Sequence, residues 1–331
     1  MTVGLVPGIR IVSSEAQVES MGAMRRRDIS CLATMKSPIR HILACVDRTP
    51  FTIAPERAHE FDTELNDFSL ILLPQRKWRF NCDAPTRQIW VSRGAVEIIW
   101  AASVANTVFY KHAVAGKQFD RPGEIDLQAD PELSAPLNTL RWALGCQIRG
   151  DESDNWPEEL VKPVLNPAYA SDLHLADEFC LGTCGFMLHH ELAHIRAGHT
   201  GLVSDDVSLS QEKEADIAAA EWVLDGLAGA RDMRFTKRIL SIVNGMLFLN
   251  IYGFARGTQG GRRHPFNYDR LMMPILRFLG TEAHIAESYA FAVLSLYMQV
   301  TGRAAQTGQF ETFRDALESL CDQLAAEAGN K

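Results

Sequence analysis

Apolar residues recur at helical spacing over much of the second half of the chain. One such stripe is formed by Leu188, Leu192 and Ile195, at positions i, i+4 and i+7, so one side of this segment is suited to burial. Ser171 offers an N-capping oxygen before the stripe, and Gly201 follows it as a stop signal. The pattern predicts a long helix between these two residues.

Other stretches repeat this periodicity. A second helix is expected downstream, capped by Ser208 or Ser210, with a buried stripe through Ile217, Ala220, Leu224 and Leu227. Further helical patterns begin at Ser92, Asp232 and Asn267 and include residues 284–296, and an amphipathic helix over 310–324 closes the chain.

A different pattern precedes these helices. Residues 68–73, 77–81 and 88–91 read as short strands, separated by turns at Pro74 and at residues 83–85. The sequence therefore predicts an α+β fold that is mainly helical, with a small sheet in the N-terminal half.

Domain organisation follows from composition. A chain of 331 residues with 47% hydrophobic content can bury one large core or two moderate cores. The acidic, proline-bearing stretch 151–159 is the best linker candidate. We therefore expect an N-terminal α+β region over 1–165 and a helical region over 166–331. A surface loop would look the same as a linker, so one continuous domain is equally compatible.

Charge and cysteine usage narrow the class of protein. A net charge of −8 argues against a nucleic-acid binder, which needs a basic surface. Seven scattered cysteines indicate reduced thiols in the cytosol, and residues 1–11 lack the pattern of a secretory signal. The uncharged runs 239–255 and 288–302 are interpreted as buried core helices. We expect a cytoplasmic protein without a membrane span or a nucleic-acid partner.

The long predicted helix contains His190-Glu191-Leu192-Ala193-His194, which fits the H-E-x-x-H pattern of zinc-dependent hydrolases. On a helix, positions four apart share one face, so the two histidines can bind a single metal ion. Glu191 lies beside that face and can take a proton from the attacking water without ligating the metal.

The second predicted helix supplies the expected third ligand. Glu212 and Asp216 are four residues apart and share a face. Glu212 can complete a catalytic site of two histidines and one glutamate, leaving one position open for water. Asp216 can accept a hydrogen bond from the free ring nitrogen of a ligand histidine and so fix its tautomer.

Rival ligands are less suitable by spacing. His199 does not fit the metzincin pattern and is interpreted as a feature of the helix end, where a histidine complements the helix dipole. Glu214 is expected to be solvated, and Asp205 and Asp206 are expected in the intervening loop. Cys180 and Cys184 lie off the histidine face, so packing is the better interpretation.

These two motifs resemble those of the gluzincin metallopeptidases. The run from His189 to Ile195, together with Gln211-Glu212-Lys213-Glu214-Ala215-Asp216, resembles more specifically the Lit family of bacterial phage-exclusion peptidases. This resemblance implies a zinc protease that a phage-derived peptide or protein activates. It further implies that the enzyme then cleaves elongation factor Tu, a host translation factor, in an abortive anti-phage response.

A third segment, His264-Pro265-Phe266-Asn267-Tyr268-Asp269-Arg270, resembles the H-P-x-x-x-x-R element of the HtpX and CAAX-protease relatives. His264 is our candidate donor to the tetrahedral oxyanion, and the alternative is that it caps the helix beginning at Asn267. Arg270 could assist the oxyanion or anchor its loop by an ion pair. The glycine-rich residues 256–263 suggest a mobile flap, and Tyr252, Tyr268 and Tyr289 are other possible donors.

The sequence thus favours a zinc endopeptidase that hydrolyses a specific cytosolic protein. The helical region over 166–331 is the expected metallopeptidase region, and the region over 1–165 could bind substrate or regulate. One alternative is a regulatory metallopeptidase that resembles the IrrE/ImmA group and cleaves a repressor under stress. The other is a non-catalytic interaction protein with a structural zinc, although such a zinc usually has four protein ligands.

Overall fold

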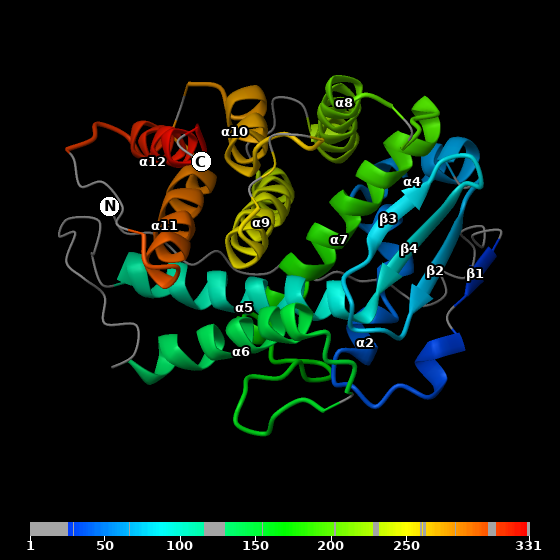
Figure 1. The fold of residues 1–331 in the computed structure, drawn as a ribbon, viewed down its shortest axis with the longest axis horizontal. Helices are drawn as coiled ribbons and strands as arrows, with labels where there is room; N and C mark the ends of the chain where they lie inside the picture. The colour runs from blue at the N-terminus through cyan, green and yellow to red at the C-terminus, as the bar shows by residue number, and fades with distance from the viewer. Residues whose placement is uncertain are drawn as a thin grey trace.

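The structure, a computed structural model, describes residues 26–28, 30–65, 67–115, 130–153, 155–201, 203–227, 232–258, 260, 263–281, 283–303 and 309–329. Helices dominate these segments, and one small sheet lies at the side of the molecule (Figure 1). The mainly helical α+β class is therefore confirmed. Residues 1–11, which carried the argument against a secretory signal, lie outside the described residues.

The sheet has four strands in the order β1-β2-β4-β3. Strands β1 (Arg26–Asp28), β2 (Ser69–Leu73) and β4 (Gln88–Ser92) are parallel, whereas β3 (Phe80–Asp83) pairs antiparallel with β4. In the register, Ile89 of β4 lies opposite Leu70 on one side and Cys82 on the other. Strand β3 is consequently an edge strand, and it lies beside helix α7 (Asp172–Ala197) (Figure 1).

Strand β3 begins three residues later than the sequence predicts. The backbone N–H of Trp78 donates to the Gln147 side chain at 2.5 Å, and the N–H of Arg79 donates to Ser92 Oγ at 2.9 Å. These side-chain bonds keep residues 77–79 out of a regular ladder. The strand then continues through Asp83, where the sequence predicts a turn, and β1 was not predicted at all.

Short helices follow one another over residues 30–65, among them α2 (Arg40–Leu43), α3 (Thr49–Thr52) and α4 (Ala58–Glu60), and long helices make up most of the remaining fold. Helix α6 (Pro131–Arg149) was missed from the sequence, since Pro136 in its interior argues against a continuous helix. Asp130 caps it by accepting from the Glu132 N–H at 2.9 Å. The long helices are α5 (Arg93–Ala115), α6 (Pro131–Arg149), α7, α8 (Asp205–Leu224), α9 (Met233–Arg256), α10 (Asn267–Phe278), α11 (Ile285–Val300) and α12 (Phe313–Gly329).

Helix α7 begins as predicted and ends earlier than predicted. Ser171 caps it by accepting from the His174 N–H at 3.2 Å. At its other end Gly198 takes a left-handed conformation (φ 64°), and the His199 N–H donates to the His194 carbonyl at 3.0 Å. The helix therefore stops before Gly201, because a glycine turn of this type closes the last carbonyls.

Helix α8 starts before the predicted caps. Ser204 occupies the cap position, and Asp205 and Asp206 form the acidic first turn rather than part of a loop. Carboxylates are stabilised there because the helix dipole is positive at its N-terminus. The predicted caps Ser208 and Ser210 lie inside the helix.

Helix α7 runs between the sheet and the other helices, and it packs against α5, α8 and α9 (Figure 1). One hydrophobic cluster includes residues from Leu32 to Leu324 and so draws on both predicted regions. The described part of the supposed linker is tied down, since the Arg76 N–H donates to Glu152 at 2.6 Å. The division at residue 165 stays a prediction.

Helix α9 contains the first of the uncharged runs. It is the one helix in the described segments that is long and apolar enough to cross a membrane. Inside the molecule, 83% of its most apolar 18-residue stretch is buried. Burial against the other helices accounts for this apolar composition, as the core-helix interpretation expected.

Candidate metal centre

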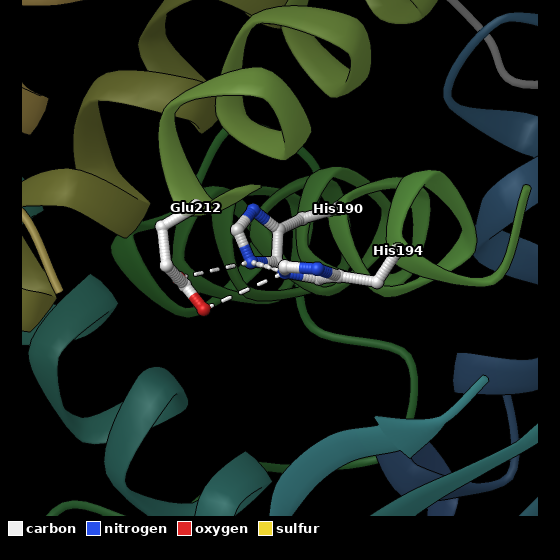
Figure 2. Close-up of side chains that lie close together, drawn as sticks. All are labelled: His190, His194 and Glu212. Carbon is white, nitrogen blue, oxygen red and sulfur yellow. Dashed lines mark hydrogen bonds and ion pairs between the residues drawn. The ribbon is translucent and has the colours of Figure 1, made fainter. Parts of the chain in front are cut away.

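Two helices bring three potential ligands together. His190 and His194 come from one face of α7, and Glu212 projects toward them from α8 (Figure 2). The Nε2 atoms of the two histidines are 3.1 Å apart. Glu212 Oε2 lies 3.5 Å from His190 Nε2, and Glu212 Oε1 lies 3.6 Å from His194 Nε2. Among the described residues, this is the one His/Cys/Asp/Glu group with metal-ligand geometry.

The spacing of these atoms fits a small tetrahedral ion. Ligand atoms about 2.0–2.1 Å from a tetrahedral zinc ion are about 3.4 Å from one another. The two histidine nitrogens are 3.1 Å apart, and the nearer Glu212 oxygen lies 3.5 Å from His190 and 3.6 Å from His194, Oε2 in the first case and Oε1 in the second. With one ligand atom from each residue, all three atoms lie within 4.8 Å of one another. Two neutral imidazoles and one carboxylate are also a donor set that zinc accepts.

His190 is supported from behind by Asp216. Its Nδ1 lies 2.9 Å from Asp216 Oδ1, and Arg270 of α10 binds both Asp216 oxygens at 2.6 and 2.7 Å. Burial alone would lower the pKa of His190, but Asp216 and Glu212 outweigh it and raise the pKa to about 10. Burial would raise the pKa of Glu212, yet hydrogen bonds to His190 and His264 hold this pKa well below its ordinary value.

Glu191 lies beside the ligands and against strand β3. Its side chain is 8% exposed. Burial raises the pKa of Glu191, while the neighbouring His190 and hydrogen bonds from the thiol and the backbone N–H of Cys82 act in the opposite direction. A carboxylate with a raised pKa is better matched to proton transfer near neutral pH.

Comparison with known proteins decides the family. The model of the family described as Peptidase U49 matches residues 89–292, which include the three candidate ligands, Glu191, Asp216 and Arg270. The chain belongs to the peptidase U49 family. It is also 29% identical over 245 residues to the cell death peptidase of Escherichia coli K12, covering 72% of this chain and 80% of that protein. No solved structure matches significantly.

Membership of the U49 family confirms that the chain is of Lit type and is a protease. The matched residues begin in β4 and extend into α11. They therefore contain α7, α8 and α10, the three helices that supply the candidate centre.

The segment before α10 brings His264 to the edge of the centre of this U49 peptidase. Its Nδ1 lies 3.2 Å from Glu212 Oε2, and its side chain is 62% exposed. The capping alternative is wrong, because Phe266 holds the cap position of α10 and makes no side-chain cap bond. Residues 259, 261 and 262 of the predicted flap lie outside the described residues.

Arg270 anchors α10 to α8 through Asp216, as the ion-pair alternative expected. Its Nη2 also lies 4.0 Å from Glu212 Oε2. Of the three tyrosines, Tyr289 is committed to the core, where its hydroxyl donates to Asn244 at 2.9 Å. Tyr268 stacks on Phe266.

The rival ligands lie elsewhere. Asp205 pairs with Arg263 at 3.7 Å at the start of α8. Cys180 and Cys184 are fully buried in the hydrophobic core, as the packing interpretation expected. His199 reaches the back of His194 rather than the Nε2 that faces Glu212, because the two Nδ1 atoms are 2.8 Å apart.

Sequence reasoning missed two features of the site. Cys82 touches Glu191 across the gap between β3 and α7, and burial, followed by the Glu191 charge, raises the pKa of its thiol. His189 is 3% exposed, lies with Nε2 3.1 Å from the Pro50 carbonyl, and stacks on Trp222. The doubled histidine in the motif was the available signal, since a histidine facing away from the metal must find its own partner.

Proposed function

We propose that this U49 peptidase is a zinc-dependent endopeptidase with zinc held by His190, His194 and Glu212. The observation that carries the proposal is the convergence of three side chains that each offer one ligand atom, all within 4.8 Å of one another. Zinc bound there would supply Lewis acidity to the water and the scissile carbonyl. Three protein ligands favour a catalytic site over a structural one, which takes four.

Glu191 is the proposed general base. It is not one of the three converging ligands, so its carboxylate is free to take a proton from the attacking water and pass it to the leaving amine. Cys82 of β3 is its neighbour on the side of the sheet. His264 is the proposed donor to the oxyanion, because an exposed imidazole 3.2 Å from Glu212 borders the site. Arg270 holds Asp216 and adds positive charge beside Glu212.

Strand β3 is the proposed docking edge for the substrate backbone. It ends the sheet and lies next to α7, so an extended peptide added there would pass over Glu191. Edge strands present N–H and C=O groups that can pair with another chain.

The proposed biological role is abortive anti-phage defence in the cytoplasm, in which a phage-derived peptide or protein activates cleavage of a host translation factor. Similarity to a protein named cell death peptidase supports this role, as does the resemblance to the Lit family. Elongation factor Tu is the proposed substrate.

Two measurements test the proposal. Metal analysis of the purified protein should give one zinc per chain, and absence of bound zinc after reconstitution would refute the metal site. N-terminal proteomics should then compare infected cells that produce the wild type with cells that produce Glu191→Gln. A new N-terminus in elongation factor Tu found only with the wild type would support the substrate, and a new N-terminus elsewhere would replace it.

A further inference from the structure

His199 occupies a position that the roles above leave unexplained. The left-handed turn at Gly198 brings it back over the end of α7, where its backbone N–H donates to the His194 carbonyl. Its ring then stands edge-on to the His194 ring, with centroids 5.0 Å apart and planes at 70°. The two Nδ1 atoms are 2.8 Å apart, and the His199 side chain is only 9% exposed.

The second nitrogen of His199 also has a partner. Its Nε2 lies 3.4 Å from Glu214 Oε2 on α8. Glu214 was expected to be solvated, and its side chain is 64% exposed. One of its oxygens nevertheless faces the histidine pair, so the contacts form a chain from His194 through His199 to Glu214.

The nitrogen that ligates from His194 decides which atoms donate and which accept along these contacts. Its Nε2 faces Glu212 and His190, so a neutral His194 that ligates through Nε2 carries its proton on Nδ1. His199 must then accept that proton's hydrogen bond at its own Nδ1. Its remaining proton lies on Nε2, which is the atom that faces the Glu214 carboxylate. Every donor therefore meets an acceptor in one arrangement of protons.

We propose that His199 and Glu214 are positioning residues that hold the metal ligand His194 in its ligating tautomer and orientation. This inference rests on the proposed zinc site. The pair does for His194 what Asp216 and Arg270 do for His190, so each ligand histidine is supported through its Nδ1. Such outer partners orient the ring and increase metal affinity.

Zinc affinity, measured by competition with a chelator, tests the inference without using catalysis. His199→Phe keeps a ring and removes both nitrogens, and it should weaken zinc binding about 10- to 100-fold. His199→Asn restores an acceptor near Nδ1 and should remain within about threefold of the wild type. Glu214→Gln should lose less than about fivefold, because the pair it breaks is exposed to solvent. Glu221→Gln, elsewhere on α8, is the matched control and should leave affinity unchanged.

A second measurement covers the case in which His199→Phe does not fold. In the zinc-loaded wild type labelled with 15N-histidine, NMR should find the proton of His199 on Nε2 and that of His194 on Nδ1. The opposite tautomer of His199 would overturn the inference. So would wild-type zinc affinity in His199→Phe, and in that case the zinc site itself would still stand. A wild type that binds no zinc would refute the proposed function together with this inference.

Discussion

Two neighbouring histidines on α7 have opposite environments. His189 faces the core, where its ring stacks on Trp222 and its Nε2 lies 3.1 Å from the Pro50 carbonyl, and burial lowers its pKa to about 3. His190 is also buried but faces two carboxylates, which overcome burial and raise its pKa to about 10. Burial is common to both, so the difference comes from charged partners.

This contrast shows how one helix serves two purposes. The His189 face attaches α7 to the N-terminal segment and α8 through an uncharged hydrogen bond and aromatic contacts. The His190 face presents the candidate ligand atoms at fixed positions, because the His189 face of the same helix cannot shift without disturbing the core. A centre built this way needs little rearrangement to bind an ion.

The contrast is tested most strongly at Glu191, which lies on the same side of α7 as His190 and is not one of the three proposed zinc ligands. Glu191→Gln should retain one zinc per chain and lose about 10²- to 10⁴-fold in cleavage rate, because it removes only the proton acceptor. Cleavage of the substrate identified by proteomics and metal content are measured on the same sample. Loss of zinc in this variant would give Glu191 a structural role.

A ligand on the charged side should affect binding rather than proton transfer. Glu212→Ala removes one of the three proposed ligands and should weaken zinc binding by more than about 100-fold, which is the upper limit for residues that only hydrogen-bond to a ligand. Asp205→Ala, which changes the former rival on the same helix, is the control and should bind zinc normally. Full zinc content in Glu212→Ala would move the third ligand elsewhere.

The sequence predicted those parts of the site that depend on helical periodicity. His190 and His194 share a face by spacing alone, and Glu212 and Asp216 are presented together for the same reason. These four side chains come together once the second helix packs antiparallel to the first. The same local logic predicted most helices and three of the strands.

The remainder depended on contacts between distant segments. The His199 contact requires the turn at Gly198 and the position of α8, and neither is encoded within a helical period. The late start of β3 depends on Gln147, which lies in α6, a helix that the sequence pattern did not predict. Such contacts are decided by tertiary packing, which overrides local preference.

A substitution at Asp216 sharpens the comparison, because Asp216→Asn removes the charge behind His190 and keeps the shape of the side chain. Asp216→Asn should weaken zinc binding about tenfold, because the amide still accepts from Nδ1 but no longer carries the charge that balances Arg270. Chelator competition measures the effect, and Asp232→Asn at the cap of α9 is a control remote from the ligands. An unchanged affinity would mean that Asp216 serves only the ion pair with Arg270.

His189 tests the uncharged side and should have the smallest effect at neutral pH. His189→Phe keeps the stack on Trp222 and loses the hydrogen bond to Pro50, which should cost about 1 kcal/mol of unfolding free energy at pH 7.

Because the folded-state pKa of His189 is lowered to about 3, the unfolded chain binds a proton below pH 6.5 that the folded protein does not. Wild-type stability therefore falls as pH drops through this window, by about 1.4 kcal/mol per pH unit from this group. The variant lacks that loss and should become the more stable of the two near pH 5, with zinc affinity at pH 7 unchanged. Urea unfolding at several pH values measures the difference, and parallel stability curves would show that His189 is protonated in the fold and that the two faces of α7 are not distinct in charge.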